Sequence, residues 1–243
     1  MASKATSQRK GFEALKVPLV LLWVVSCLCA CAQAVCPSGC ACDDENLLVN
    51  CVDANLDFVP ITLNPLVQKL LLKNNRIRSV ESGFAFYHEL NFIDLSHNHL
   101  LKISQGSFST QTKLNELHLN NNKITSLSNL TFGGSGSASG NRGLPSLIHL
   151  NLRVNLLENI ESGIFIFTRN LKELDLGENS LREINSSAFQ GLEKLKILRL
   201  DRNELRRVPS VFSNRTANFG QYSEHSGTAR LTQLVELFMG KSQ

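Results

Sequence analysis

The chain has 243 residues, 42% of them hydrophobic and 19% charged, and a formal net charge of +4 at pH 7. Residues 1–34 hold four of the 25 basic residues and one of the 21 acidic residues, so the rest of the chain has 21 basic and 20 acidic residues and a net charge of +1. A near-neutral chain argues against a generic nucleic-acid or polyanion binder, because such proteins attract their ligands through an excess of positive charge.

Residues 1–34 have the pattern of a secretory signal peptide. Four basic residues precede an apolar run over 17–30, which is shorter than the about 20 residues of a membrane span, and Ala32 and Ala34 supply a small-x-small cleavage site. We expect cleavage after Ala34 and secretion of the rest, with an uncleaved anchor as the alternative. No later apolar stretch is long enough to cross a bilayer, so the sequence as written predicts a secreted or extracellular chain.

Four cysteines follow the leader directly in the spacing C-x3-C-x-C-x8-C, at Cys36, Cys40, Cys42 and Cys51. An even set of cysteines after a signal peptide favours disulfides over free thiols, and four cysteines allow three connectivities. A zinc site is the competing interpretation, but no histidine completes the spacing of a typical ligand set.

The rest of the chain repeats one frame, L-x-x-L-x-L-x-x-N-x-L, seen most clearly over 171–181. Its first position recurs seven times at spacings of 23 to 39 residues: Val67, Leu90, Leu114, Leu147, Leu171, Leu195 and Leu234. Six of these repeats carry the frame asparagine: Asn75, Asn98, Asn122, Asn155, Asn179 and Asn203. Such a period is the signature of leucine-rich repeats, which stack to bury their leucines against one another.

The positions of the frame have separable roles. Leu174 and Leu176 alternate around Asp175, so the leucines should face the core and Asp175 the concave surface. The asparagine should turn inward and bond backbone groups left unpaired where the strand ends. A phenylalanine then enters the core on the return segment of each repeat: Phe84, Phe108, Phe132, Phe165, Phe189 and Phe212.

The cysteine spacing and the repeats together resemble the extracellular leucine-rich repeat proteins, a broad family that includes Slit-like ligands, receptor ectodomains and small proteoglycans. The resemblance implies an α/β-type solenoid, a right-handed horseshoe with a concave parallel sheet and irregular or 3-10 convex returns. It also implies an N-terminal cap over 35–62, with Cys36 bonded to Cys42 and Cys40 to Cys51, and repeats over 63–243, six full and a seventh truncated.

Two insertions and the end of the chain depart from the regular frame. Extra residues at 135–143 and 215–230 follow the core phenylalanine, where they can bulge from the convex side without breaking the strands. The seventh repeat stops after its strand, at Ser242 in place of asparagine, and no C-terminal cap follows. The sequence could therefore be a fragment or short isoform of a transmembrane receptor, or an end-to-end dimer through its open last strand.

The outward strand positions predict a protein-binding face. Parallel strands about 4.8 Å apart place equivalent residues of adjacent repeats side by side, over a width that suits a protein patch. We expect Asp94 to meet His118 and Asp175 to meet Arg199. The predicted contact residues are Phe92, as the apolar anchor, with Asp94, Glu116, His118, His149, Asn151, Arg153, Glu173, Asp175 and Arg199.

His149 is expected between Glu116 and Glu173, whose charges favour the protonated imidazole, so ligand affinity should change with pH. Reversing the charge of Arg153 and Arg199 should abolish binding and leave stability nearly intact. A solvated, self-paired charge ladder with no ligand is the alternative, because exposed ion pairs are individually weak.

The pattern favours a secreted or cell-surface recognition module that binds a protein ligand or receptor; the alternative is a structural matrix protein of the small-proteoglycan kind. No catalytic motif or cofactor site stands out, and the histidines flanking Asn98 lack a third metal donor. Three sequons predict N-linked glycans near the return segments: Asn129, Asn185 and Asn214.

Overall fold

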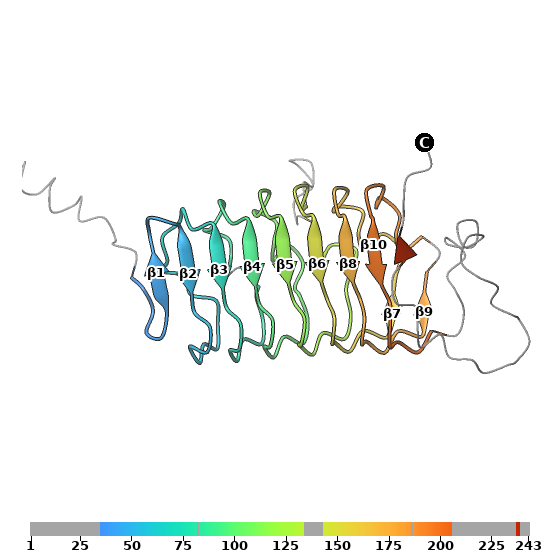
Figure 1. Cartoon of the computed structure of the whole chain (residues 1–243), viewed down its shortest axis with the longest axis horizontal. Coiled ribbons are helices and arrows are strands. Elements are labelled where there is room, and N and C mark those ends of the chain that lie inside the picture. The colour runs from blue at the N-terminus through green and yellow to red at the C-terminus, as the bar shows by residue number, and fades with distance from the viewer. Residues whose placement is uncertain (1–34, 82, 134–142, 186, 206–236, 239–243) are drawn as a thin grey trace, which may run out of the picture. The chain divides into compact units, whose positions relative to one another are not determined.

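The computed structural model describes residues 35–81, 83–133, 143–185, 187–205 and 237–238. The predicted signal peptide, the insertion at 215–230, Phe212 and Asn214 lie outside these residues, as does the insertion at 135–143 apart from Gly143. In the repeat-bearing part of the chain, short strands follow one another across a single sheet in the order β1-β2-β3-β4-β5-β6-β8-β10-β11 (Figure 1).

Six of these strands come from the six predicted repeats and have three residues each. They are β3 (Lys69–Leu71), β4 (Phe92–Asp94), β5 (Glu116–His118), β6 (His149–Asn151), β8 (Glu173–Asp175) and β10 (Ile197–Arg199). Neighbours pair in parallel with no register shift, so the first residue of each strand is opposite the first residue of the next. The middle residue is buried in all six, and the frame leucines on either side of the strand complete the core.

The predicted N-terminal cap is an antiparallel hairpin of β1 (Ala41–Asp43) and β2 (Leu48–Asn50), and β2 pairs in parallel with β3. Disulfides join Cys36 to Cys42 and Cys40 to Cys51, which confirms the connectivity implied by the family resemblance and overturns the zinc alternative. Cys51 is fully buried, and its N–H donates to the Leu71 carbonyl at 2.8 Å. The hairpin therefore covers the apolar end of the first repeat, which would otherwise face water.

The frame asparagines connect adjacent repeats through their side-chain amides. Asn179 Nδ2 donates to the carbonyls of Leu176 and Gly177 in its own turn, both at 3.1 Å, and to Leu152 of the preceding repeat at 3.0 Å. Its Oδ1 accepts the N–H of Leu157 at 3.1 Å. The other five make the same four contacts: Asn75, Asn98, Asn122, Asn155 and Asn203. Backbone groups at the strand ends are thus satisfied inside the core, as predicted.

The turn before each frame asparagine uses the left-handed backbone region. The preceding residue has φ between 49° and 56° in all six repeats: Asn74, His97, Asn121, Val154, Glu178 and Arg202. Asparagine tolerates this region, whereas a β-branched residue such as Val154 is strained there. The uniform geometry shows that this backbone turn, rather than the side chain at the position, is what each repeat requires.

The return segments bury the predicted phenylalanines. Phe84 stacks on Phe108 with ring centroids 5.4 Å apart, and Phe165 stacks between Phe132 and Phe189 at 6.0 and 6.2 Å. All five rings are buried. Fully burying one such side chain contributes roughly 1.5–3 kcal/mol, so this row stabilises the convex side as the leucines stabilise the sheet side.

The convex returns differ in detail from the implied α/β-type and 3-10 structure. The described residues contain no helix of either kind, and most returns are turns. In repeats 4 and 5 the returns instead form a two-stranded parallel sheet from β7 (Asn159–Ile160) and β9 (Glu183–Ile184). A plain 24-residue spacing between these repeats keeps the two return segments in step, so their backbones can pair.

The last strand contradicts the expected seventh repeat. β11 (Leu237–Phe238) pairs with β10 in an antiparallel direction, with Ile197 opposite Phe238 and Leu198 opposite Leu237. A repeat strand would be parallel and would place Glu236 opposite Ile197. The 39-residue spacing from Leu195 to Leu234 exceeds the 24 residues of a regular return, so the chain is not held to the repeat's direction when it pairs with the free edge of β10.

Candidate functional site

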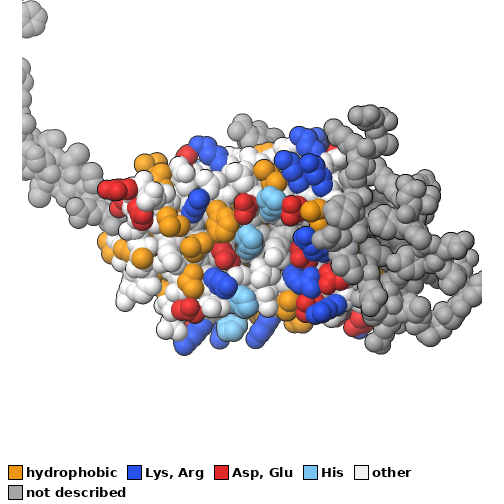
Figure 2. All heavy atoms as spheres, viewed as in Figure 1, with side chains coloured by type: hydrophobic (Ala, Val, Ile, Leu, Met, Phe, Trp, Pro, Cys, Tyr) orange, Lys and Arg blue, Asp and Glu red, His pale blue; other side chains and the backbone are white. Residues whose placement is uncertain are grey.

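The sheet has one buried face and one open face, and the open face carries the predicted binding residues. The first and third residues of each central strand point away from the core and are partly exposed, while the middle residue is buried. Figure 2 shows this open face, with histidine and acidic side chains together near its centre. The strand register places equivalent residues of adjacent repeats side by side, as the sequence predicted.

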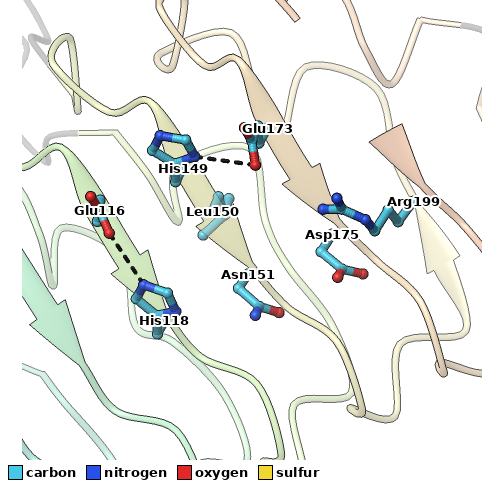
Figure 3. Close-up of a pocket in the computed structure, with 8 residues that line it drawn as sticks. All are labelled: Glu116, His118, His149, Leu150, Asn151, Glu173, Asp175 and Arg199. Atoms are coloured by element: carbon cyan, nitrogen blue, oxygen red, sulfur yellow. Dashed lines mark ion pairs between the residues drawn. The ribbon is translucent and has the colours of Figure 1, made fainter. Parts of the chain in front are cut away.

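Strands β5, β6, β8 and β10 form a shallow hollow of about 200 Å³ on this face. Seven of its eight lining residues belong to the predicted contact set, and the eighth, Leu150, is its nearly buried floor. They are Glu116, His118, His149, Leu150, Asn151, Glu173, Asp175 and Arg199 (Figure 3). We call this set the central hollow.

Two histidine–glutamate pairs line the central hollow. His149 Nδ1 lies 3.4 Å from Glu173 Oε2 across the β6–β8 boundary, and His118 Nε2 lies 3.6 Å from Glu116 Oε2 within β5 (Figure 3). All four side chains are 31–43% exposed. These separations exceed those of good hydrogen bonds, so the pairs are loose and their groups remain accessible to a partner.

The expected contact between Asp94 and His118 does not form. The His118 imidazole pairs with Glu116 and packs in a tilted arrangement on the Phe92 ring, with centroids 5.3 Å apart. Asp94 Oδ1 instead accepts the N–H of Ser96 at 2.8 Å, which holds the turn after its own strand. The Phe92–His118 pair thus forms an apolar rim beside the central hollow.

Asp94 shares this turn-holding role with other residues of its column. Asn151 Oδ1 accepts the N–H of Arg153 at 3.0 Å, and Asp175 Oδ1 accepts that of Gly177 at 2.9 Å. A short Asp or Asn side chain that accepts a backbone N–H two residues later is a known turn motif, so these contacts could have been predicted from the sequence. Three of the predicted contact residues are therefore partly committed to the backbone of their own repeat.

Arg153 belongs to a structural ion-pair network and does not line the central hollow. Its guanidinium binds Asp201 through two hydrogen bonds of 3.0 and 2.8 Å and Glu178 through one of 2.7 Å, and it lies 3.5 Å from Asp175. To reach Asp201 it crosses the β8 repeat at Gly177, where a Cβ atom would collide with the guanidinium and lie 2.7 Å from Asp201 Oδ1. We define the Arg153 network as Arg153, Asp175, Glu178 and Asp201.

Asp175 lies opposite Arg199 in the register of β8 and β10, as expected, and it also forms an ion pair with Arg153. Burial raises the pKa of Asp175 above its usual value, although the Gly177 N–H and the charges of Arg153 and Arg199 act in the opposite direction. The hydrogen bond from Arg153 lowers the pKa of Asp201, so this contact stabilises the charged form of Asp201. The same contacts raise the pKa of Arg153.

Other residues singled out in the sequence lie away from the central hollow. His97 and His99 flank the buried Asn98 in the turn after β4, and within the described residues no group of three suitable side chains could hold a metal ion. The sequon residues Asn129 and Asn185 are exposed on the segments that follow their strands, while Thr131 of the first sequon is buried. No helix in the described part of the chain is long and apolar enough to span a membrane.

Every described repeat uses the same short strand, inward asparagine and buried return, so the fold is a leucine-rich repeat solenoid with a disulfide-bonded N-terminal cap. Residues 88–137 and 145–205 match the leucine rich repeat family. The repeats within these two ranges therefore belong to the leucine rich repeat family, and the chain is similar to several proteins over part of its length.

Three relatives illustrate the similarity. Amphoterin-induced protein 2 of Homo sapiens is 39% identical over 90 residues, which are 36% of this chain and 17% of that protein. Reticulon-4 receptor-like 2 of Rattus norvegicus is 38% identical over 100 residues, 41% of this chain and 24% of that protein. Leucine-rich repeat-containing protein 3B of Homo sapiens is 33% identical over 112 residues, 45% of this chain and 43% of that protein. The chain thus matches less than half the length of each of these relatives.

Proposed function

We propose that the chain is an extracellular recognition module that binds a protein partner through the central hollow and its Phe92–His118 rim. The observation that carries this proposal is the gathering of seven polar or charged side chains from four adjacent strands on one open face. The similarity to a protein named as receptor-like supports it. The two cap disulfides support an extracellular location, because such bonds persist in oxidising compartments.

The chemistry of the central hollow suits a protein surface better than a small molecule. Its volume of about 200 Å³ is below the roughly 300–1,000 Å³ of most small-ligand pockets. Acidic groups at Glu116 and Glu173 and a basic group at Arg199 offer both signs of charge, which gives specificity and orientation. Phe92 is the apolar group beside them, and aromatic residues are enriched among the residues that dominate binding energy.

A charge-reversal pair tests this proposal. The double variant Glu116→Lys and Glu173→Lys changes two exposed side chains of the central hollow, so secretion and thermal stability should remain close to those of the unmodified chain. The control is Glu81→Lys with Glu161→Lys, two exposed residues of the return segments that undergo the same change of charge. Both variants and the unmodified chain would be oligomerised and applied to an array of purified extracellular protein domains.

The expected result is a set of binding domains retained by the control and lost by the variant of the central hollow. Binding that survives in the hollow variant and disappears in the control would move the site to the return segments. If no domain bound and the chain self-associated at micromolar concentration in sedimentation equilibrium, the alternative function in matrix assembly would replace this one.

A further inference from the structure

A second surface lies at the carboxyl ends of the strands, away from the central hollow. Two positions after the frame asparagine, the first three repeats each bury a residue, at Ile77, Leu100 and Ile124. The residues on either side of each buried position are exposed, so they point outward. Backbone bonds of 2.9 Å from His99 to Ile77 and from Lys123 to Leu100 keep these segments of successive repeats adjacent.

In the first three repeats this border is rich in basic side chains. We define the basic edge as four of these outward residues and the exposed Lys102 beside them: Arg76, Arg78, His99, Lys102 and Lys123. Neither 95–115 nor 117–157 contains an Asp or Glu residue, so repeats 2 and 3 supply no acid to this border. Figure 2 shows Lys and Arg side chains along the lower border of the view, where the strands end.

The charges of the basic edge are not neutralised within the part of the chain that the structure describes. No ion pair there involves Arg76, Arg78, Lys102 or Lys123, although Asp57 of the cap lies in the row next to Arg78. In repeats 5 and 6 the arginines near this border form ion pairs. Arg182, three residues after Asn179, pairs with Glu204 at 3.1 Å, and Arg202, in the turn before Asn203, pairs with Glu178 at 3.2 Å.

We propose that the basic edge binds a linear sulfated polysaccharide. Adjacent segments about 5 Å apart place cations in a row across three repeats, which matches a chain with closely spaced anionic groups better than a single ion. The segments that carry these cations, 76–79, 99–102 and 123–126, hold no Phe, Tyr or Trp, whereas protein interfaces and single-stranded nucleic-acid sites depend on aromatic contacts. The near-neutral net charge is no obstacle, because acids elsewhere in the chain offset the local excess.

The test uses heparin as the probe and the secreted chain as the protein. The triple variant Arg76→Gln, Lys102→Gln and Lys123→Gln removes three charges from the basic edge. Its control, Lys113→Gln, Arg182→Gln and Arg202→Gln, removes three exposed charges that are already paired with acids. A third variant changes a separate group of exposed lysines at the opposite ends of the strands, Lys172→Gln, Lys194→Gln and Lys196→Gln.

Heparin affinity would be measured over a series of salt concentrations. The basic-edge variant should bind about 100-fold more weakly, from roughly fivefold per lost cation, and its salt dependence should flatten by about two to three contacts. The control should bind within about threefold of the unmodified chain. Equal losses in the two variants would show that only net charge matters and would overturn the proposal.

Two further outcomes would also overturn it. Loss of heparin binding in the lysine variant alone would place the site at the opposite border, and absence of measurable binding by the unmodified chain at low salt would remove the site altogether. Because the central hollow is unchanged in all three variants, these outcomes leave the proposed protein recognition to its own test.

Discussion

Replacing Arg153 by methionine should destabilise the fold, because Arg153 is the cation that contacts all three acids of the Arg153 network. The Arg153 side chain is only 27% exposed, and its partners Asp175 and Asp201 are 14% and 15% exposed. Methionine keeps much of the aliphatic volume but removes the bidentate bond to Asp201 and the bond to Glu178. The two acids would then remain close together without their shared counter-charge.

The expected loss is about 2–4 kcal/mol of unfolding free energy. Removing one member of a fully buried ion pair costs roughly 3–5 kcal/mol, and the partial exposure of this network lowers that figure. A hydrogen bond to a charged group contributes about 1.5–3 kcal/mol, which gives a similar estimate for the bidentate contact. Denaturant titration followed by circular dichroism would measure the change, with a probe in each half of the solenoid because repeat arrays can unfold in parts.

The matched control is Arg182→Met, which breaks a pair whose side chains are 56% and 48% exposed. It should cost less than about 1 kcal/mol, as surface pairs usually do. Adding Asp201→Asn to the Arg153 variant should restore part of the loss, because it removes an unpaired charge. If Arg153→Met and Arg182→Met destabilised equally, the network would have no special role and Arg153 would again be a candidate contact residue.

Three further changes test the same geometry by thermal or denaturant unfolding. Val154→Asn should stabilise by about 0.5–1 kcal/mol because it relieves a left-handed valine at φ 53°, and Asn121→Val should cost a similar amount at φ 56°; unchanged stability in both would contradict this. Gly177→Ala should cost about 1–2 kcal/mol by displacing the guanidinium, and no change would show that the side chain finds another route. The pKa of Asp201 is lowered, so its contribution is complete above the ordinary value of 3.8 and is lost as the pH falls through the folded pKa. Asp201→Asn should therefore cost more at pH 7 than near pH 3, whereas Asp175, whose pKa is raised by burial, should not show this trend.

The parts of the fold that the sequence predicted are those encoded within one period. Leu174, Leu176 and Asn179 can be assigned to core and turn because their spacing alone determines where they lie in a strand of three residues. The register between strands follows, since equal periods leave no slack between neighbouring repeats. The same periodicity places His149 beside Glu173 and predicts most of the residues that line the central hollow.

Features that depend on irregular lengths or on side-chain reach could not be predicted in this way. The prediction of a seventh repeat strand, which would be parallel to β10, was wrong, because β11 is antiparallel. The 39 residues between Leu195 and Leu234 exceed one repeat, so the repeat spacing does not determine the direction of this strand. The convex pairing of β7 with β9 involves return segments whose residues follow no strict frame. Both cases lie where the repeat constrains the backbone least.

Arg153 shows why the columns of the open face were only partly informative. A column is the set of residues at the same position of successive repeats, and the sequence analysis paired each residue with its neighbours in its column. Short side chains such as Asn151 and Asp94 instead bond the backbone of their own turn, a motif that the sequence could have indicated. An arginine reaches farther. Gly177 leaves the adjacent position of the column empty, so the guanidinium passes over it to Asp201, 48 positions along the chain. A glycine in such a column therefore predicts contact between the second neighbours, and this rule would have separated the structural Arg153 from the accessible groups of the central hollow.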